Sequence, residues 1–169
     1  MNDYTSTFDV ASLMNTQMEG GLDSRYIPHP IGEWTGMIGV DEKDVEIKST
    51  KAGGVMLNVY ITTDREDVTG VTNRTPTRVR WNCMLDMNAT KTGLDMSPGK
   101  NRRLGMLLTA LGLQDADGSN SRPWSLSGLG GRPIRYAVAH KPRQVKVGDN
   151  YVDDPEGGIE DEVSSIARV

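Results

Sequence analysis

The sequence has 169 residues, of which 36% are hydrophobic, and its formal net charge is −4. This length suits one domain with loose ends, and it is sufficient to bury a hydrophobic core without disulfides or metals. No apolar run approaches the roughly 18 residues of a membrane span, and the first residues lack the basic and apolar stretches of a secretory signal. The single cysteine, Cys83, cannot form an internal disulfide, so we expect a reducing cytoplasm.

Charge is distributed unevenly along the chain. Residues 1–40 carry a net charge of −4, residues 41–147 carry +6 and residues 148–169 carry −6. A basic body between acidic ends is common among proteins that bind single-stranded DNA, but acidic ends can also be merely disordered and soluble. The charge pattern alone favours neither interpretation.

The predicted elements begin after an extended N-terminal lead-in, residues 1–31, in which residues 8–14 suit a short helix or an added strand. Apolar and polar residues alternate over 32–40, where Trp34, Ile38 and Val40 share a face, and 45–47 can extend this first strand. A second strand covers 55–62, and the polar segment 63–76 is predicted to be a mobile loop.

The third predicted strand, 77–86, has the sharpest division between its faces. Val79, Trp81, Cys83 and Leu85 form an apolar face, while Arg78, Arg80 and Asn82 form a polar one. This parity places Trp81 in the core, and the same argument places Trp34 there. The leucines of 99–113 recur at helical spacing, so this segment is predicted to be the one helix, with Gly112 at its C-terminal end.

Residues 132–140 and 144–152 are predicted to be the fourth and fifth strands, and 153–169 an acidic, disordered tail. A mainly β chain with about five strands and a helix after the third is typical of an OB-fold barrel, here spanning residues 32–152. A different small β-barrel, such as an SH3-like one, predicts much of the same pattern.

The sequence offers no convincing catalytic or metal-binding set. His29 and His140 are far apart in sequence, and Asp86 and Asp95 are the only interior carboxylates that could serve a metal-dependent nuclease. Cys83 lies on an apolar strand face, which favours a buried structural thiol over a nucleophile. We therefore expect a protein that is not an enzyme and uses no cofactor or metal.

A sequence-tolerant binder of single strands needs cations for the phosphates and flat rings for the bases. The strand parity places both on one side, with Tyr60 as the best stacking platform beside Arg78 and Arg80. The complete set of predicted DNA contacts is Lys48, Lys51, Asn58, Tyr60, Arg78, Arg80, Lys100, Arg102, Arg103, Arg135, Lys141, Arg143 and Lys146.

Several short motifs occur along residues 8–142, of which the longest is LDMSPGKNRRLG at 94–105, completed by ALG at 110–112. This run resembles the segment "LDMGKGKNxxLGxLxxALG" of the single-stranded DNA-binding proteins of tailed bacteriophages, except that Ser97 and Pro98 depart from it. Further agreement comes from FDV at 8–10, YIP at 26–28, GEW at 32–34, PWSL at 123–126, LGG at 129–131 and AHKP at 139–142.

The resemblance implies an OB-fold that coats single strands during phage replication or recombination, in the cytoplasm of the infected bacterium. It also implies that the acidic C-terminal tail contacts replication or recombination proteins, although the tail here lacks an aromatic tip. The alternative from another class is a structural or protein-interaction module of the phage, built on a small β-barrel. In either case no membrane association is expected.

Overall fold

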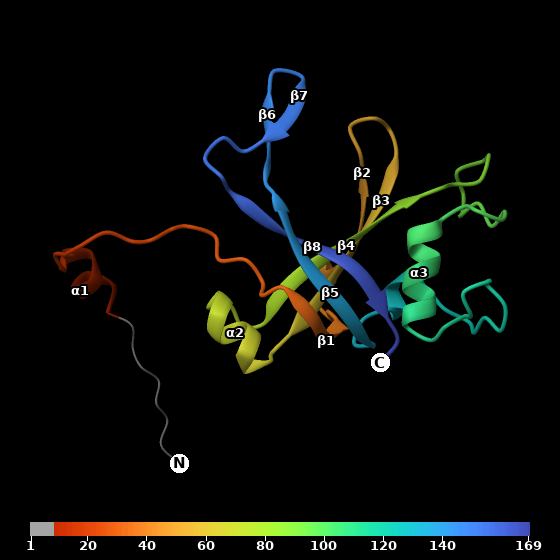
Figure 1. The fold of residues 1–169 in the computed structure, drawn as a ribbon, viewed down its shortest axis with the longest axis horizontal. Coiled ribbons are helices and arrows are strands. Elements are labelled where there is room, and N and C mark those ends of the chain that lie inside the picture. Colours follow the sequence, from red (N-terminus) through yellow and green to blue (C-terminus); the bar gives the residue numbers. More distant parts are fainter. Residues whose placement is uncertain (1–8) are drawn as a thin grey trace, which may run out of the picture.

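The structure is a computed structural model, which describes residues 9–169 (Figure 1). It is mainly β, as the sequence predicts, and none of the helices within the described part has the length and apolar character to span a bilayer. The helices are α1 (Val10–Asn15), α2 (Glu66–Thr72) and α3 (Arg102–Ala110), with 3-10 turns η1 (Glu42–Asp44) and η2 (Leu126–Gly128). The strands are β1 (Gly32–Ile38), β2 (Val45–Ser49), β3 (Val55–Thr63), β4 (Thr77–Leu85), β5 (Pro133–Pro142), β6 (Gln144–Val147), β7 (Asn150–Asp153) and β8 (Ile159–Ala167).

The main sheet has six antiparallel strands, and β3 is its organising member. One edge of β3 pairs with β4 over its whole length, while the other edge pairs first with β2 and then with the end of β1. The sheet continues from β1 through β5 to β8. Its two outermost strands, β4 and β8, are not hydrogen-bonded to each other, so the sheet is not closed into a barrel; α3 packs against both.

The hydrophobic core lies between the concave side of this sheet and α3. The inward residues of β4 are Val79, Trp81, Cys83 and Leu85, all buried as the alternation predicts. Leu104, Leu107 and Leu108 of α3 meet them from the other side, and Trp34 packs against the cluster while partly exposed. Val40 is exposed rather than on the inward face, because β1 ends at Ile38.

The predicted mobile loop at 63–76 is wrong, because the segment contains α2. Glu66 and Asp67 occupy its first turn, where carboxylates stabilise the helix dipole, and Arg65 pairs with Asp67 at 2.8 Å. Val68 is fully buried and anchors the helix to the body. One buried valine in a polar segment is too weak a pattern to predict a helix.

The disordered acidic tail is also wrong. Residues 159–167 form β8, which pairs with β5 from Pro142↔Ile159 to Arg135↔Ala167 and buries Val163. Residues 144–152, predicted to be the fifth strand of the barrel, belong instead to the separate hairpin β6–β7, which projects from the body (Figure 1). The domain therefore extends beyond residue 152, and a long connection carrying the hairpin separates its last two sheet strands.

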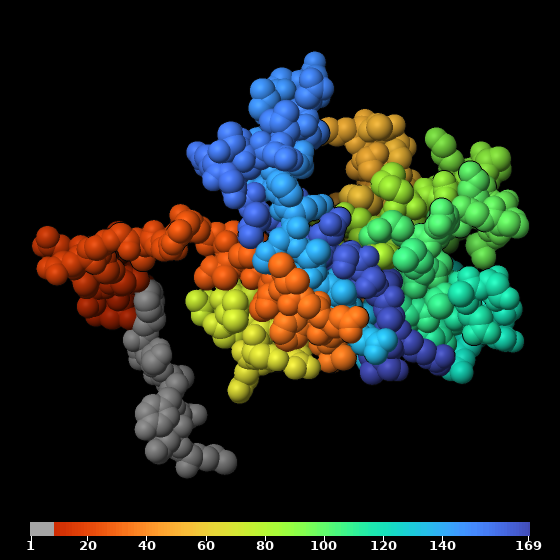
Figure 2. All heavy atoms as spheres, viewed as in Figure 1, coloured from red at the N-terminus to blue at the C-terminus, as the bar shows by residue number. Residues whose placement is uncertain are grey.

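The N-terminal segment 9–25, called the arm below, extends away from the body (Figures 1 and 2). Every residue of the arm is exposed, and α1 buries none. Asp9 caps α1 by accepting a hydrogen bond from the Ser12 amide at 3.1 Å. Within the predicted lead-in, residues 9–31 form the short helix α1 followed by extended chain, while residues 1–8 lie outside the described part.

The arm is attached to the body by a polar cluster at its root. The Tyr26 hydroxyl donates to the Asp161 carboxylate of β8, and the His29 amide donates to the same carboxylate at 2.8 Å. His29 is fully buried; its Nδ1 lies 2.8 Å from the Pro30 carbonyl and its Nε2 lies 3.0 Å from the Tyr136 hydroxyl. Because the carbonyl can only accept, Nδ1 carries the proton of a neutral ring.

Candidate nucleic-acid interface

The side chains of β2, β3 and β4 that point away from the hydrophobic core form one surface, which we call the outer face. The strand register determines its members. Tyr60 lies opposite Arg80, Asn58 opposite Asn82, and Met56 between Lys48 and Met84. The outer face consists of Glu46, Lys48, Met56, Asn58, Tyr60, Thr62, Arg78, Arg80, Asn82 and Met84.

Tyr60 is partly exposed, and a cation lies over its ring. The Arg78 guanidinium carbon is 5.0 Å from the ring centroid, within the range of a cation–π contact. Arg78 is also ion-paired with Asp44, whose side chain is only 3% exposed. The buried carboxylate therefore holds the guanidinium at the ring, and the sequence-predicted pair of ring and cation is assembled in the structure.

Asp44 is positioned by its own local structure rather than by the sheet. The Asp41 amide donates to its Oδ2 at 3.0 Å, closing the turn η1. The buried Gly39 lies directly beneath the carboxylate, where a Cβ would collide with it. Gly39 is therefore required for Asp44 to approach, and Asp44 in turn orients Arg78. No alternation or spacing in the sequence indicates this contact, because Asp44 lies in the turn between two strands.

Two amides lie side by side in the middle of the outer face. Asn58 is 3% exposed, and its Oδ1 has no hydrogen-bond donor among the described residues; the Oδ1 of Asn82 is also buried without one. A buried acceptor without a partner costs about 1–3 kcal/mol. The face thus holds hydrogen-bonding capacity that the described residues leave unused.

The other cations near this face differ in how firmly they are held. Arg80 is exposed and makes no ion pair within residues 9–169. Lys48 pairs with Glu46 at 3.1 Å, where both side chains are about half exposed and the bond is therefore weak. Lys51 lies in the exposed turn between β2 and β3. Arg80 and Lys51 are the cations most available to a phosphate.

The predicted cations at the start of α3 separate into two groups. Lys100 and Arg102 are exposed at the rim of an open hollow beside the helix. Arg103 instead lies on the Trp81 ring, with its guanidinium carbon 3.6 Å from the centroid, and its Nε donates to the Asn82 carbonyl at 2.6 Å. Arg103 thus covers a core tryptophan and satisfies the free edge of β4, which is a structural contact.

The remaining predicted cations do not join the outer face. Arg135 projects from β5, opposite Thr35 of β1. Lys141 pairs with Glu160 of β8 at 3.6 Å, and Lys146 lies on the β6–β7 hairpin. Arg143 holds the base of that hairpin: its Nε donates to the buried Asp154 at 2.9 Å. The Glu156 amide and then Arg143 lower the pKa of the Asp154 carboxyl, so it is ionised as this pairing requires.

The predicted DNA contacts leave out two methionines of the outer face and the anchoring acid, Asp44. Met56 and Met84 are register partners on the outer face, and both follow from the strand parity that identified Tyr60 and Arg78. Asp44 has no comparable signal. Flexible thioethers adapt to flat aromatic surfaces, so the pair extends the area on which a base can lie.

No set of three or more His, Cys, Asp or Glu within residues 9–169 is placed to hold a metal ion. Burial raises the pKa of the Cys83 thiol to about 11, which keeps it protonated in the core. No protein-family model matches the chain, and no curated protein matches it in sequence.

Proposed function

We propose that this protein binds single-stranded DNA without regard to sequence, along the outer face of β2, β3 and β4. The observation that carries the proposal is the juxtaposition of the Tyr60 ring with Arg78 and Arg80, which offers a base a stacking surface and its phosphates two cations. Base stacking on an aromatic side chain contributes about 1–3 kcal/mol and tolerates any base.

The topology supports the same proposal. We interpret the main sheet as an OB-fold: β1 and β2 act as one bent first strand, β3, β4, β5 and β8 follow, and α3 lies between the third and fourth. OB-folds bind oligonucleotides on the face of their second and third strands and with the loops beside it. In this chain those strands are β3 and β4, and the adjoining hairpins β2–β3 and β6–β7 rise on one side of the sheet (Figure 1).

The unused amides of Asn58 and Asn82 support a polar ligand at this place. A nucleobase edge supplies both donors and acceptors, and an amide can rotate to match either. A base that draws these buried side chains outward would therefore recover hydrogen bonds that the free protein lacks. The setting implied by the family resemblance, replication or recombination of phage DNA in a bacterial cytoplasm, is part of the proposal.

The test is a fluorescence-anisotropy titration of a labelled oligo-dT, with the same strand in a duplex as the comparison. We expect the single strand to bind more tightly and the logarithm of affinity to fall linearly with that of salt, by about 0.7 for each phosphate contact. Tyr60→Ala should weaken binding by about five- to a hundredfold, whereas Tyr60→Phe retains the ring and should bind nearly as well.

Arg80→Ala provides a second variant with a matched control. It should weaken binding and reduce the salt slope by roughly 0.7, because one phosphate contact is lost. Arg122→Ala removes an equally charged, exposed residue from the loop after α3 and should change neither. Equal affinity for single strand and duplex, or equal effects of the two arginine variants, would refute the proposed interface. Either result would favour the alternative function, a structural or protein-interaction module.

A further inference from the structure

The arm presents apolar side chains that its own molecule leaves uncovered. Val10, Leu13 and Met14 recur at the i, i+3, i+4 spacing of one helix face, and Met18 and Leu22 follow; all are exposed, Leu22 by 98%. A helix of six residues is marginal in water without a packing surface. The arm therefore carries the pattern of a segment that is completed by docking.

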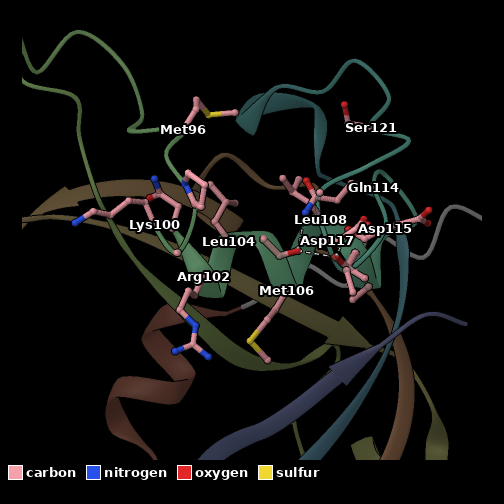
Figure 3. Close-up of a pocket in the computed structure, with 18 of the residues that line it drawn as sticks. Met96, Lys100, Arg102, Leu104, Met106, Leu108, Gln114, Asp115, Asp117 and Ser121 are labelled. Atoms are coloured by element: carbon pink, nitrogen blue, oxygen red, sulfur yellow. Dashed lines mark hydrogen bonds between the residues drawn. The ribbon is translucent and has the colours of Figure 1, made fainter.

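The body carries a hollow of about 1040 Å³ along α3 (Figure 3). Its lining includes Met96, Lys100, Arg102 and Met106, which we call the α3 patch. Both methionines are exposed, Met96 by 79%, and both cations lack ion-pair partners within residues 9–169. In Figure 3 Lys100 lies at one end of the hollow, and the acidic end, with Asp115, lies at the other.

The arm and the α3 patch are complementary in charge as well as in apolar character. The arm, residues 9–25, contains three carboxylates and one cation, Arg25, which is already paired with Asp23. The patch offers two cations beside two methionines, whose flexible side chains adapt to other apolar groups. An acidic, apolar segment therefore fits the patch better than it fits the acidic end of the same hollow.

We propose that the arm of one molecule docks on the α3 patch of a second copy of this chain. The arm leaves the body on the side opposite α3 (Figure 1), so each molecule offers its arm at one end and its patch at the other. Such a head-to-tail contact is heterologous and extends into an open chain of molecules rather than closing as a dimer. If the protein binds DNA as proposed above, this arrangement gives cooperative coating of the strand. Self-association in the absence of DNA does not depend on the proposed function.

The test is sedimentation velocity of the full chain in the absence of DNA, over protein concentrations of about 10 to 200 μM, the range of weak interfaces. We expect the weight-average mass to rise above the 18.5 kDa of one chain as concentration increases. The double variant Leu13→Asp/Met14→Asp should weaken association at least about tenfold, because two apolar contacts are lost. Ser12→Asp/Asn15→Asp adds the same charge off the apolar face and should associate like the parent.

Mixing provides the decisive arm of the experiment. Met96→Asp/Met106→Asp changes only the patch, so this variant and the arm variant should each remain monomeric. A mixture of the two contains one intact arm and one intact patch per pair, and it should form dimers that grow no further. The proposal would be overturned by a monomeric parent or by an arm variant that still associates. A mixture that stays monomeric would also overturn it, because docking of the arm on its own body predicts that result. Because DNA is absent, none of these outcomes bears on strand binding.

Discussion

The two ends of the chain are alike in sequence and opposite in structure. Both are acidic, and both have apolar residues scattered among polar ones. The C-terminal end forms β8, which is paired along β5 and buries Val163, whereas the arm at the N-terminal end buries nothing. Composition therefore does not decide order in these two segments; they differ in whether they pair with the sheet. The C-terminal segment pairs with the edge of β5, whereas the arm pairs with no strand of the described sheet.

The largest expected difference comes from placing the same charge in each end. Val163→Asp puts an unpaired carboxylate into the core and should destabilise the protein by at least about 3 kcal/mol, which is enough to unfold a marginal domain. Leu22→Asp on the arm should leave the melting temperature unchanged, since Leu22 is exposed. Thermal unfolding followed by circular dichroism measures both. Equal melting temperatures would mean that β8 is not part of the core.

A smaller effect is expected where the two ends meet. Asp161→Ala removes the acceptor shared by the Tyr26 hydroxyl and the His29 amide, and should cost about 1–3 kcal/mol. It should also make the chain near Ile27 more susceptible to proteases, because its attachment to β8 is lost. Glu160→Ala removes an exposed neighbour whose pair with Lys141 is weak, and is the matched control. If both variants melt alike, the root of the arm is not held by Asp161.

The smallest of the three effects is a dependence on pH. Burial lowers the pKa of His29 below the value of about 6.5 that an unfolded histidine has. The unfolded chain therefore takes up this proton first on acidification. The contribution of neutral His29 to stability is complete above about pH 6.5 and is lost as the pH falls toward the folded pKa, by at most about 1.4 kcal/mol per pH unit.

Denaturant unfolding at a series of pH values measures this slope, and His29→Gln should flatten it. His29→Gln keeps a polar side chain at the position but cannot titrate. An unchanged slope in the variant would assign the pH dependence to other groups.

The sequence predicted the parts of the fold in which side chains alternate strictly. In β3 and β4 every second residue is buried or apolar, and both strands lie close to their expected bounds. The α3 helix is likewise marked by leucines at helical spacing, although it starts later than expected, after Asn101 in a left-handed conformation. The candidate stacking residue and its two arginines follow from the same alternation.

The parts that could not be predicted depend on tertiary contacts. In β8 the register skips Ser164 at a bulge, so Val163 and Ile166 are three residues apart and the two-residue period is broken. The scattered acids of this strand then resemble a disordered tail. Arg103 and Arg143 were expected to contact DNA from their charge alone, yet Trp81 and Asp154, which they contact, lie 22 and 11 residues away. Charge identifies a cation but not its partner.

Strand binding on the outer face of β3 and β4 can be tested directly by crosslinking. Ultraviolet crosslinking of the full chain to oligo-dT carrying a photoreactive thymine, followed by mass spectrometry, locates the strand without any variant. We predict crosslinks in the peptides of β3 and β4, centred on Tyr60 and Met84. Crosslinks confined to α3 or to the β6–β7 hairpin, with none on these two strands, would contradict this prediction.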